Sequence, residues 1–77
     1  MKHNGFYYYK IDVIGRNGYS FMVKSKTELD DMYDAIDIAS KNNLFSDEAD
    51  ADYAEVDDLV SEYDINNFEQ CGCAYEI

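Results

Sequence analysis

The chain has 77 residues, of which 17 are Asp or Glu and 6 are Lys or Arg, so its formal net charge is −11. This charge disfavours nucleic acid and anionic membranes as direct partners, because proteins bind both through Lys and Arg. Hydrophobic residues still make up 47% of the chain, which excludes a disordered acidic tail. The length predicts one small domain, residues 1–77, with too little interior for a deep catalytic cleft.

The sequence contains no signal for a membrane or for secretion. No stretch approaches the roughly 18 consecutive apolar residues that a membrane helix needs. The first residues do not resemble a signal peptide, because Lys10 and Asp12 interrupt the apolar run that starts at Phe6. We therefore expect a cytoplasmic protein.

Residues 6–24 predict a β-hairpin, because apolar and polar side chains alternate on both sides of the turn sequence 15–18. A two-residue turn would place the apolar sets of the two strands on opposite faces. We therefore predict a three-residue loop from Arg16 to Gly18, with Gly18 left-handed, which gives a single buried face. This register predicts two cross-strand pairs: Val13 with Phe21, and Ile11 with Val23.

Two helices are expected to follow the hairpin. The capping-box sequence from Ser25 to Glu28 predicts the start of the first, which should end near residues 41–43. Ser46 predicts the cap of the second, and acidic residues in its first turn suit the positive end of the helix dipole. The apolar stripes at helical spacing are Leu29, Met32, Tyr33 and Ile36 in the first helix, and Ala49, Tyr53, Val56, Val60 and Tyr63 in the second.

The C-terminal part is less regular in pattern. Residues 64–70 predict at most a short turn, anchored by Ile65 and Phe68, and residues 73–77 alternate as in a third strand. The element order is therefore β-β-α-α-β in the α+β class. We predict a three-stranded antiparallel sheet with both helices packed on one face.

The two cysteines, Cys71 and Cys73, are separated by Gly72. A structural zinc site takes four ligands, and the other soft candidate is His3. A disulfide across one residue is expected to be strained, because the Cα atoms that it joins have a narrow range of separations. We expect ordinary thiols, with an intermolecular disulfide or a weak metal site as alternatives.

No catalytic or metal-binding motif emerges from the sequence. Asp50 and Asp52 resemble the start of an EF-hand loop, but Glu55 and Ser61 occupy the positions that require Gly and Glu. His3 is the single histidine, and no Ser-His-Asp set, Cys-His pair or glycine-rich phosphate loop is present. We therefore predict a protein that is not an enzyme and that has no metal site and no cofactor.

The distribution of charge is the sharpest feature of the sequence. Residues 28–64 contain 14 of the 17 acids and a single base, Lys41, whereas residues 1–27 contain five bases and one acid. Carboxylates four residues apart on a helix lie about 6 Å apart along its axis, so rows of them on two adjacent helices could imitate DNA phosphates. An acidic face that serves only solubility is the alternative. The predicted partner-binding residues are Asp30, Asp31, Asp34, Asp37, Asp47, Glu48, Glu55, Asp58 and Glu62.

The small size, the acidity, the tyrosine content and the compact α/β pattern resemble small phage-encoded anti-defence proteins, the anti-CRISPR and anti-restriction DNA mimics. The resemblance is one of type over the whole chain. It implies a binding-only inhibitor that blocks the DNA- or RNA-binding site of a host defence nuclease complex, such as a Cas effector or a restriction enzyme. Its carboxylates would pair with the Arg and Lys side chains that normally hold phosphates.

A second surface leads to a different functional hypothesis. The other face of the sheet carries apolar side chains that either form a partner surface or lie beneath residues 64–70 or the N-terminus. As a partner surface it would make the chain a small dimeric adaptor or regulatory protein, including an antitoxin-like one, whose acids serve solubility only. The residues of this possible second interface are Phe6, Tyr8, Ile14 and Met22.

Overall fold

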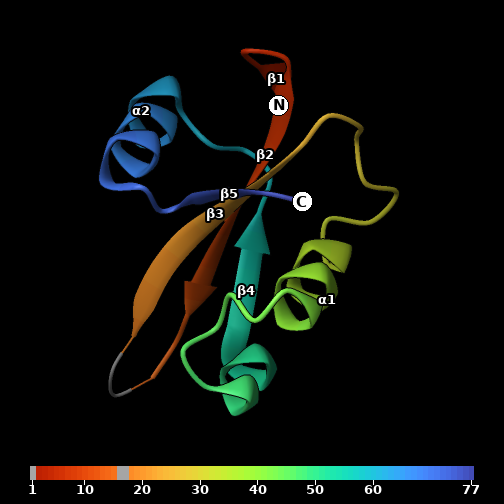
Figure 1. Cartoon of the computed structure of the whole chain (residues 1–77), viewed down its shortest axis with the longest axis vertical. Helices are drawn as coiled ribbons and strands as arrows, with labels where there is room; N and C mark the ends of the chain where they lie inside the picture. Colours follow the sequence, from red (N-terminus) through yellow and green to blue (C-terminus); the bar gives the residue numbers. More distant parts are fainter. Residues whose placement is uncertain (1, 16–17) are drawn as a thin grey trace.

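The chain folds around a hairpin of two long strands (Figure 1). A computed structural model describes residues 2–15 and 18–77. The elements in chain order are β1 (Lys2–His3), β2 (Phe6–Val13), β3 (Tyr19–Ser25), α1 (Asp34–Lys41), the 3-10 helix η1 (Glu48–Tyr53), β4 (Ala54–Asp57), α2 (Glu62–Cys71) and β5 (Ala74–Glu76). The α+β class predicted from the sequence is confirmed.

Strands β2 and β3 form the predicted hairpin, but their register differs by two residues from the prediction. Val13 pairs with Tyr19, and Ile11 pairs with Phe21. The predicted pairing of Ile11 with Val23 is therefore wrong, as is that of Val13 with Phe21. The predicted parity is confirmed, because a shift by two residues keeps every side chain on its face, and the odd-numbered residues of both strands share one core.

The loop of this hairpin is longer than the three residues predicted and spans residues 14–18. Positive φ occurs at Gly15 rather than at the predicted Gly18. Gly18 serves a close approach instead, because a Cβ atom there would lie 2.9 Å from the carbonyl oxygen of Val13. Residues 16–17 of the predicted loop lie outside the described part of the chain.

Three short strands extend the hairpin into a five-stranded sheet. Strands β1 and β4 both pair antiparallel with β2, along different parts of the edge that β3 does not occupy. Strand β5 pairs with β3 and runs parallel to it, so the sheet order is β1-β2-β3-β5 with β4 beside β2. The predicted strand at the C-terminus is present, but the prediction of a three-stranded, wholly antiparallel sheet is wrong.

Helix α1 starts well after the predicted capping box. Ser25 is buried at the end of β3, and its Oγ accepts a hydrogen bond from the N–H of Thr27 (3.2 Å) instead of capping a helix. The N–H of Leu29 donates to the hydroxyl of Tyr9 (2.9 Å), which fixes residues 26–33 to the sheet as a loop. The predicted C-terminal end of this helix is confirmed.

The second predicted helix is replaced by η1 and β4. Val56 pairs with Ile11 and is buried, while Glu55 and Asp57 on either side of it are exposed. The reason is the short β1, which pairs only with the start of β2 and leaves the backbone groups of residues 10–13 to be satisfied by another strand. The backbone hydrogen bonds that β4 makes with β2 therefore outweigh the helical spacing of the apolar residues.

Helix α2 is a full helix where only a short turn was predicted. Its N-terminus is capped by Ser61, whose Oγ accepts from the N–H of Asp64 (3.1 Å). Val60 and Ile65, on either side of this cap, are buried in one cluster, as in a hydrophobic staple. The helix ends at Gly72, which is left-handed.

The two helices cover opposite faces of the sheet (Figure 1), so the prediction that both pack on one face is wrong. Neighbouring residues of a strand point to opposite faces, and here both faces carry apolar side chains. Helix α1 covers a core of Tyr9, Ile11, Val13, Phe21, Val23, Ala35, Ala39, Phe45 and Val56. Helix α2 covers a second core of Tyr8, Met22, Val60 and Ile65.

Candidate protein-binding surface

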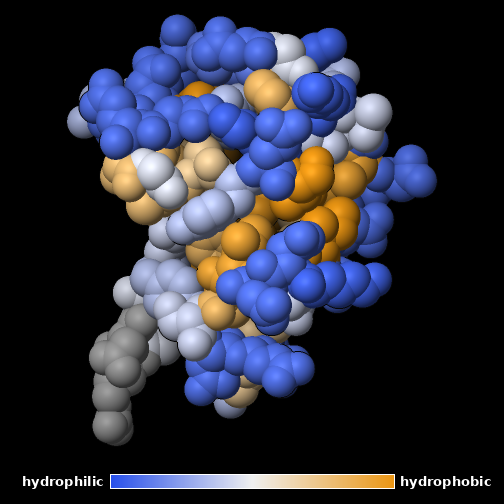
Figure 2. Space-filling view, in the orientation of Figure 1, coloured by the Kyte–Doolittle hydropathy of each residue, from blue (hydrophilic) through white to orange (hydrophobic). Residues whose placement is uncertain are grey.

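Nine carboxylates and one lysine lie in residues 28–53, which we call the acidic side. This segment comprises the loop before α1, α1 itself, the link after it, and η1. Helix α1 packs against both η1 and β4, so the segment forms one continuous part of the molecule. Figure 2 shows hydrophilic side chains over α1 and η1, with an apolar area between α1 and α2.

The start of α1 presents its carboxylates to solvent. The Asp31 side chain accepts a hydrogen bond from the N–H of Tyr33 (2.9 Å), and the resulting turn leads into the helix at Asp34. Asp34 and Asp37 occupy the first turn, where negative charge is favoured by the helix dipole. Because α1 packs on the sheet through Ala35 and Ala39, both carboxylates remain exposed.

The 3-10 helix η1 holds further carboxylates beside α1. Asp47, not the predicted Ser46, caps it by accepting a hydrogen bond from the N–H of Ala49 (3.0 Å). The hydroxyl of Tyr19 donates to Asp50 (2.7 Å) and accepts from the N–H of Ser46 (2.9 Å), which ties η1 to β3. Asp47 and the neighbouring Glu48 remain exposed on this rigid support.

The structure divides the nine predicted partner-binding residues into two sets. The prediction of two adjacent acidic helices is wrong, because most of the second helix does not exist. The six residues on the acidic side are all exposed: Asp30, Asp31, Asp34, Asp37, Asp47 and Glu48. The other three lie elsewhere in the fold: Glu55 on β4, Asp58 in the link after it, and Glu62 at the start of α2.

These three residues do not extend the acidic side. Glu55 lies on the face of the sheet opposite to the buried Val56, directly across from Asp12 of β2. Glu62 belongs to the first turn of α2, which covers that other face. Asp58 is half-buried and engaged within the fold. The acidic surface is therefore smaller and more localised than the sequence suggested.

The lysines of the hairpin lie away from the acidic side, on the face that α2 covers. Lys24 Nζ lies 2.8 Å from Glu69 Oε2 and 5.0 Å from the centroid of the Phe6 ring. Lys10 Nζ lies 5.9 Å from the centroid of the Phe68 ring. These cations are therefore engaged by α2 and by the strands beneath it, and they do not neutralise the carboxylates around α1.

Two exposed tyrosines on the acidic side were missed by the sequence reasoning. Tyr33 is 56% exposed and Tyr53 is 64% exposed, although both were assigned to buried stripes of the predicted helices. Tyr33 precedes α1, and Tyr53 ends η1, so neither belongs to a helix face that packs on the sheet. Tyrosine is enriched at protein interfaces because it combines apolar area with a polar group.

An open hollow of about 520 Å³ lies between the end of the hairpin and η1. Asp47, Asp50 and Tyr53 line it together with Ile14, which is 55% exposed. The N–H of Ile14 donates to the carbonyl oxygen of Tyr53 (3.0 Å), which joins the two segments. The acidic side therefore has a concave part in which carboxylates lie beside apolar side chains.

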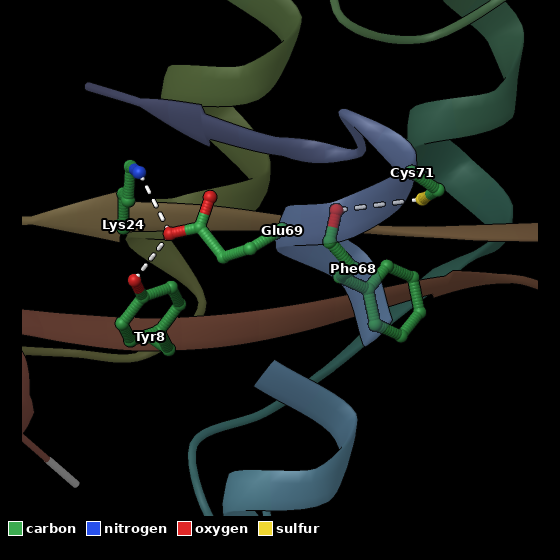
Figure 3. Close-up of polar contacts among 5 residues, drawn as sticks. All are labelled: Tyr8, Lys24, Phe68, Glu69 and Cys71. Carbon is green, nitrogen blue, oxygen red and sulfur yellow. Dashed lines mark hydrogen bonds and ion pairs between the residues drawn. The ribbon is translucent and has the colours of Figure 1, made fainter. Parts of the chain in front are cut away.

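The face opposite the acidic side is closed by α2 (Figure 3). The hydroxyl of Tyr8 donates to Glu69 Oε2 (2.5 Å), which also accepts from Lys24. Burial, together with the hydrogen bond and the charge of Glu69, raises the pKa of Tyr8 to about 12. The hydrogen bonds from Lys24 and Tyr8 lower the pKa of Glu69. These contacts attach α2 to the sheet.

The predicted second interface is therefore a core and not a free surface. Tyr8 is 1% exposed and Met22 is fully buried, and Phe6 packs against the same cluster beneath α2. Of the alternatives that the sequence left open, the one in which residues 64–70 fold over this face is correct. Ile14, the remaining member, lies in the hollow at the end of the hairpin.

In the part of the chain that the structure describes, no three His, Cys, Asp or Glu side chains converge as they would around a metal ion. Among residues 2–15 and 18–77, no helix is long and apolar enough to span a bilayer. Comparison with protein families, with curated proteins and with solved structures found no match for this chain.

Proposed function

We propose that the chain is a binding-only inhibitor whose acidic side enters the basic, nucleic-acid-binding channel of a larger protein. One observation supports the proposal. Six of the predicted partner-binding carboxylates are exposed in residues 28–53, whereas Lys10 and Lys24 of the hairpin lie on the face that α2 covers. Folding does not require this separation of charge, because interspersed lysines would reduce the repulsion between the carboxylates.

The chemistry of such a complex follows from what the channel must normally bind. Arg and Lys side chains that hold phosphates form charge-assisted hydrogen bonds with carboxylates equally well. Asp34 and Asp37, on one rigid helix, and Asp47, on the neighbouring η1, would supply the acceptors. Tyr33 and Tyr53 would add buried aromatic area, which dominates the energy of many interfaces. Association would be fast and sensitive to salt, because steering by opposite charges is screened by ions.

The resemblance to anti-defence proteins suggests which class of partner to test first. A Cas effector and a restriction enzyme both hold a nucleic-acid backbone in a channel lined by basic side chains. The proposal commits to competition with nucleic acid for that channel. It requires no catalysis by this chain and no cofactor.

The test is a binding assay with two matched variants that remove equal charge from opposite sides of the molecule. The tagged chain is mixed with purified effector or restriction complexes, and retention is measured with and without a competing DNA or RNA duplex. The acidic-side variant carries Asp30→Asn, Asp34→Asn and Asp37→Asn. The control variant carries Glu55→Gln, Glu62→Gln and Glu76→Gln.

We expect the native chain and the control variant to bind, and the acidic-side variant to lose at least tenfold in affinity. Binding should weaken strongly between about 0.15 M and about 0.5 M salt, and duplex should displace the chain. Equal loss in both variants would mean that only net charge matters and would refute the assignment of the acidic side. Binding that neither duplex nor salt affects would refute the mimicry of nucleic acid.

The alternative hypothesis, a dimeric adaptor, relied on the sheet face that carries Tyr8 and Met22 as its partner surface. Tyr8 and Met22 are buried beneath α2 and are not available to a partner. If the acids served solubility only, the acidic-side variant would bind every partner as the native chain does. The binding assay above distinguishes these two cases directly.

A further inference from the structure

Two thiols flank a left-handed glycine where α2 meets β5. Cys71 is the exposed last residue of α2, and Cys73 is half-buried just before β5. Between them, Gly72 has φ 76° and ψ 23°. The N–H of Gly72 donates to the carbonyl oxygen of Glu69 (3.2 Å), and the N–H of Cys73 donates to that of Phe68 (2.8 Å). The geometry of this junction is therefore fixed by the Schellman motif that ends the helix.

This geometry brings the Cα atoms of the two cysteines within the separation that a disulfide joins. The distance between the Cα atoms on either side of a residue depends on that residue's φ and ψ. When that residue has helical φ and ψ of either hand, the two Cα atoms lie about 5.4 Å apart. This separation follows from the helical rise of about 1.5 Å per residue and the Cα radius of about 2.3 Å. An extended residue would hold them about 7 Å apart. Disulfides join Cα atoms that are about 4.4–6.8 Å apart, so the left-handed Gly72 brings Cys71 and Cys73 into this range.

Both thiols lie beside backbone carbonyl oxygens of this junction. Cys71 Sγ donates to the carbonyl oxygen of Phe68 at 3.4 Å (Figure 3), and Cys73 Sγ lies 3.8 Å from the carbonyl oxygen of Cys71. A hydrogen bond with the thiol of Cys71, together with burial, raises the pKa of Cys73. The exposed Cys71 is thus the thiol that a reagent meets first, and Cys73 is the neighbour in position to react second.

We propose that Cys71 and Cys73 form a reversible intrachain disulfide across Gly72, with a low-molecular-weight disulfide such as oxidised glutathione as the oxidant. The thiolate of Cys71 attacks one sulfur of the small disulfide, whose S–S bond breaks and releases one small thiol. Cys73 then gives its proton to solvent and attacks the Cys71 sulfur, releasing the second small thiol. The protein loses two hydrogen atoms and two electrons are transferred, which reduces one small disulfide to two thiols.

The closed disulfide is compatible with the native fold. The N–H of Met22 in β3 donates to the carbonyl oxygen of Cys73 (2.8 Å), so the junction is already attached to the sheet. The cross-link would join two residues that hydrogen bonds hold at the required spacing. Because folding and disulfide formation are thermodynamically linked, a fold that favours the disulfide is itself stabilised by it.

The test compares the oxidation equilibrium of the folded and the unfolded chain. The protein is equilibrated in graded mixtures of reduced and oxidised glutathione, with and without denaturing urea, quenched in acid, and analysed by mass spectrometry. We expect an intrachain disulfide, seen as the loss of two hydrogen atoms and reversed by dithiothreitol. Its equilibrium constant should be about tenfold or more larger in the folded chain than in urea.

Variants at the junction make the test specific. Gly72→Ala places a side chain at a left-handed position where space is open but the backbone is strained, so it should lose most of the advantage of the folded chain while circular dichroism confirms folding. Cys73→Ser should stop at the glutathione adduct of Cys71. A glutathione adduct as the main product of the native chain, a disulfide-linked dimer, or equal constants with and without urea would each overturn the proposal.

Discussion

The substitution Ile65→Ala tests whether α2 is an integral part of the fold. Ile65 is 1% exposed and is the buried α2 residue of the second core, which it forms with Tyr8, Met22 and Val60. The change Ile65→Ala leaves the cap at Ser61 untouched and removes only buried apolar volume. If α2 covers the second face as described, this change destabilises the whole domain.

The expected size of the effect follows from the burial. Replacing a fully buried Ile by Ala costs about 2–5 kcal/mol, because apolar contacts are lost and a cavity remains. A domain of this length has a total stability of about 4–12 kcal/mol. Among the described residues the second core has four buried side chains, with Phe68 of α2 packed beside them, so Ile65 makes the largest buried contact of the helix. We expect a loss of about 3 kcal/mol.

Urea unfolding followed by circular dichroism measures this loss. With a slope of about 1 kcal/mol per molar urea, the midpoint should fall by about 3 M. The matched control is Leu59→Ala, because Leu59 precedes the same helix but is 79% exposed, and its change should stay within about 0.5 kcal/mol. An Ile65→Ala variant as stable as Leu59→Ala would refute the second core and reopen this face as a binding surface.

Two further predictions concern the hydrogen bonds around Glu69. Folding raises the pKa of Tyr8 from 10.0 to about 12, so the free energy of unfolding should fall as the pH rises through this range. The change Tyr8→Phe should remove this contribution. Urea unfolding at about pH 9 and about pH 11 measures the difference. Folding lowers the pKa of Glu69 from 4.5, so its contribution to stability is present above that value and is lost as the pH falls below it. The free energy of unfolding of Glu69→Gln should therefore change less between about pH 7 and about pH 3 than that of the native chain. The same pH dependence in both proteins would contradict the contacts assigned to Glu69.

The hairpin was predictable because its signals are local. The alternation of apolar residues fixes which side chains share a face, and a shift of two residues leaves that result intact. The register itself depended on where pairing stops. Pairing stops where Gly18 closely approaches the carbonyl oxygen of Val13, and the residue pattern of the strands does not indicate this contact.

The helical layer was not predictable in the same way. Tyr53, Val56 and Val60 recur at helical spacing, yet the alternation of Glu55, Val56 and Asp57 fits a strand equally well. The choice between them is made by the open edge of β2 beyond Tyr7, which is a feature of the folded sheet. Propensity and periodicity are weak where an unpaired edge must be satisfied.

Helix α2, by contrast, carried local signals that were overlooked. Ser61 and Asp64 form the cap, Val60 and Ile65 form the staple, and Gly72 ends the helix. The predicted helix from Ser46 extended to Tyr63, so Val60 and Ser61 were assigned to its interior instead of to the start of a new helix. Six of the predicted partner-binding acids stayed together because they lie in one continuous segment around α1. Glu55 and Glu62 were separated from them because they lie on β4 and α2, which replaced the predicted second helix.

The acidic side can be changed without loss of the fold, which makes the proposed function testable. Neutralising Asp34 and Asp37 removes two helix-dipole interactions of about 0.3–1 kcal/mol each and relieves a repulsion of a few tenths of a kcal/mol between them, whereas Asp30 lies before the helix. These effects oppose each other, so the triple Asn variant should unfold in urea within about 1.5 kcal/mol of the native chain. A loss of binding in that variant then reports the contact surface. A loss of stability of more than about 2 kcal/mol would instead show that the carboxylates serve the fold, and the proposed interface would lose its support.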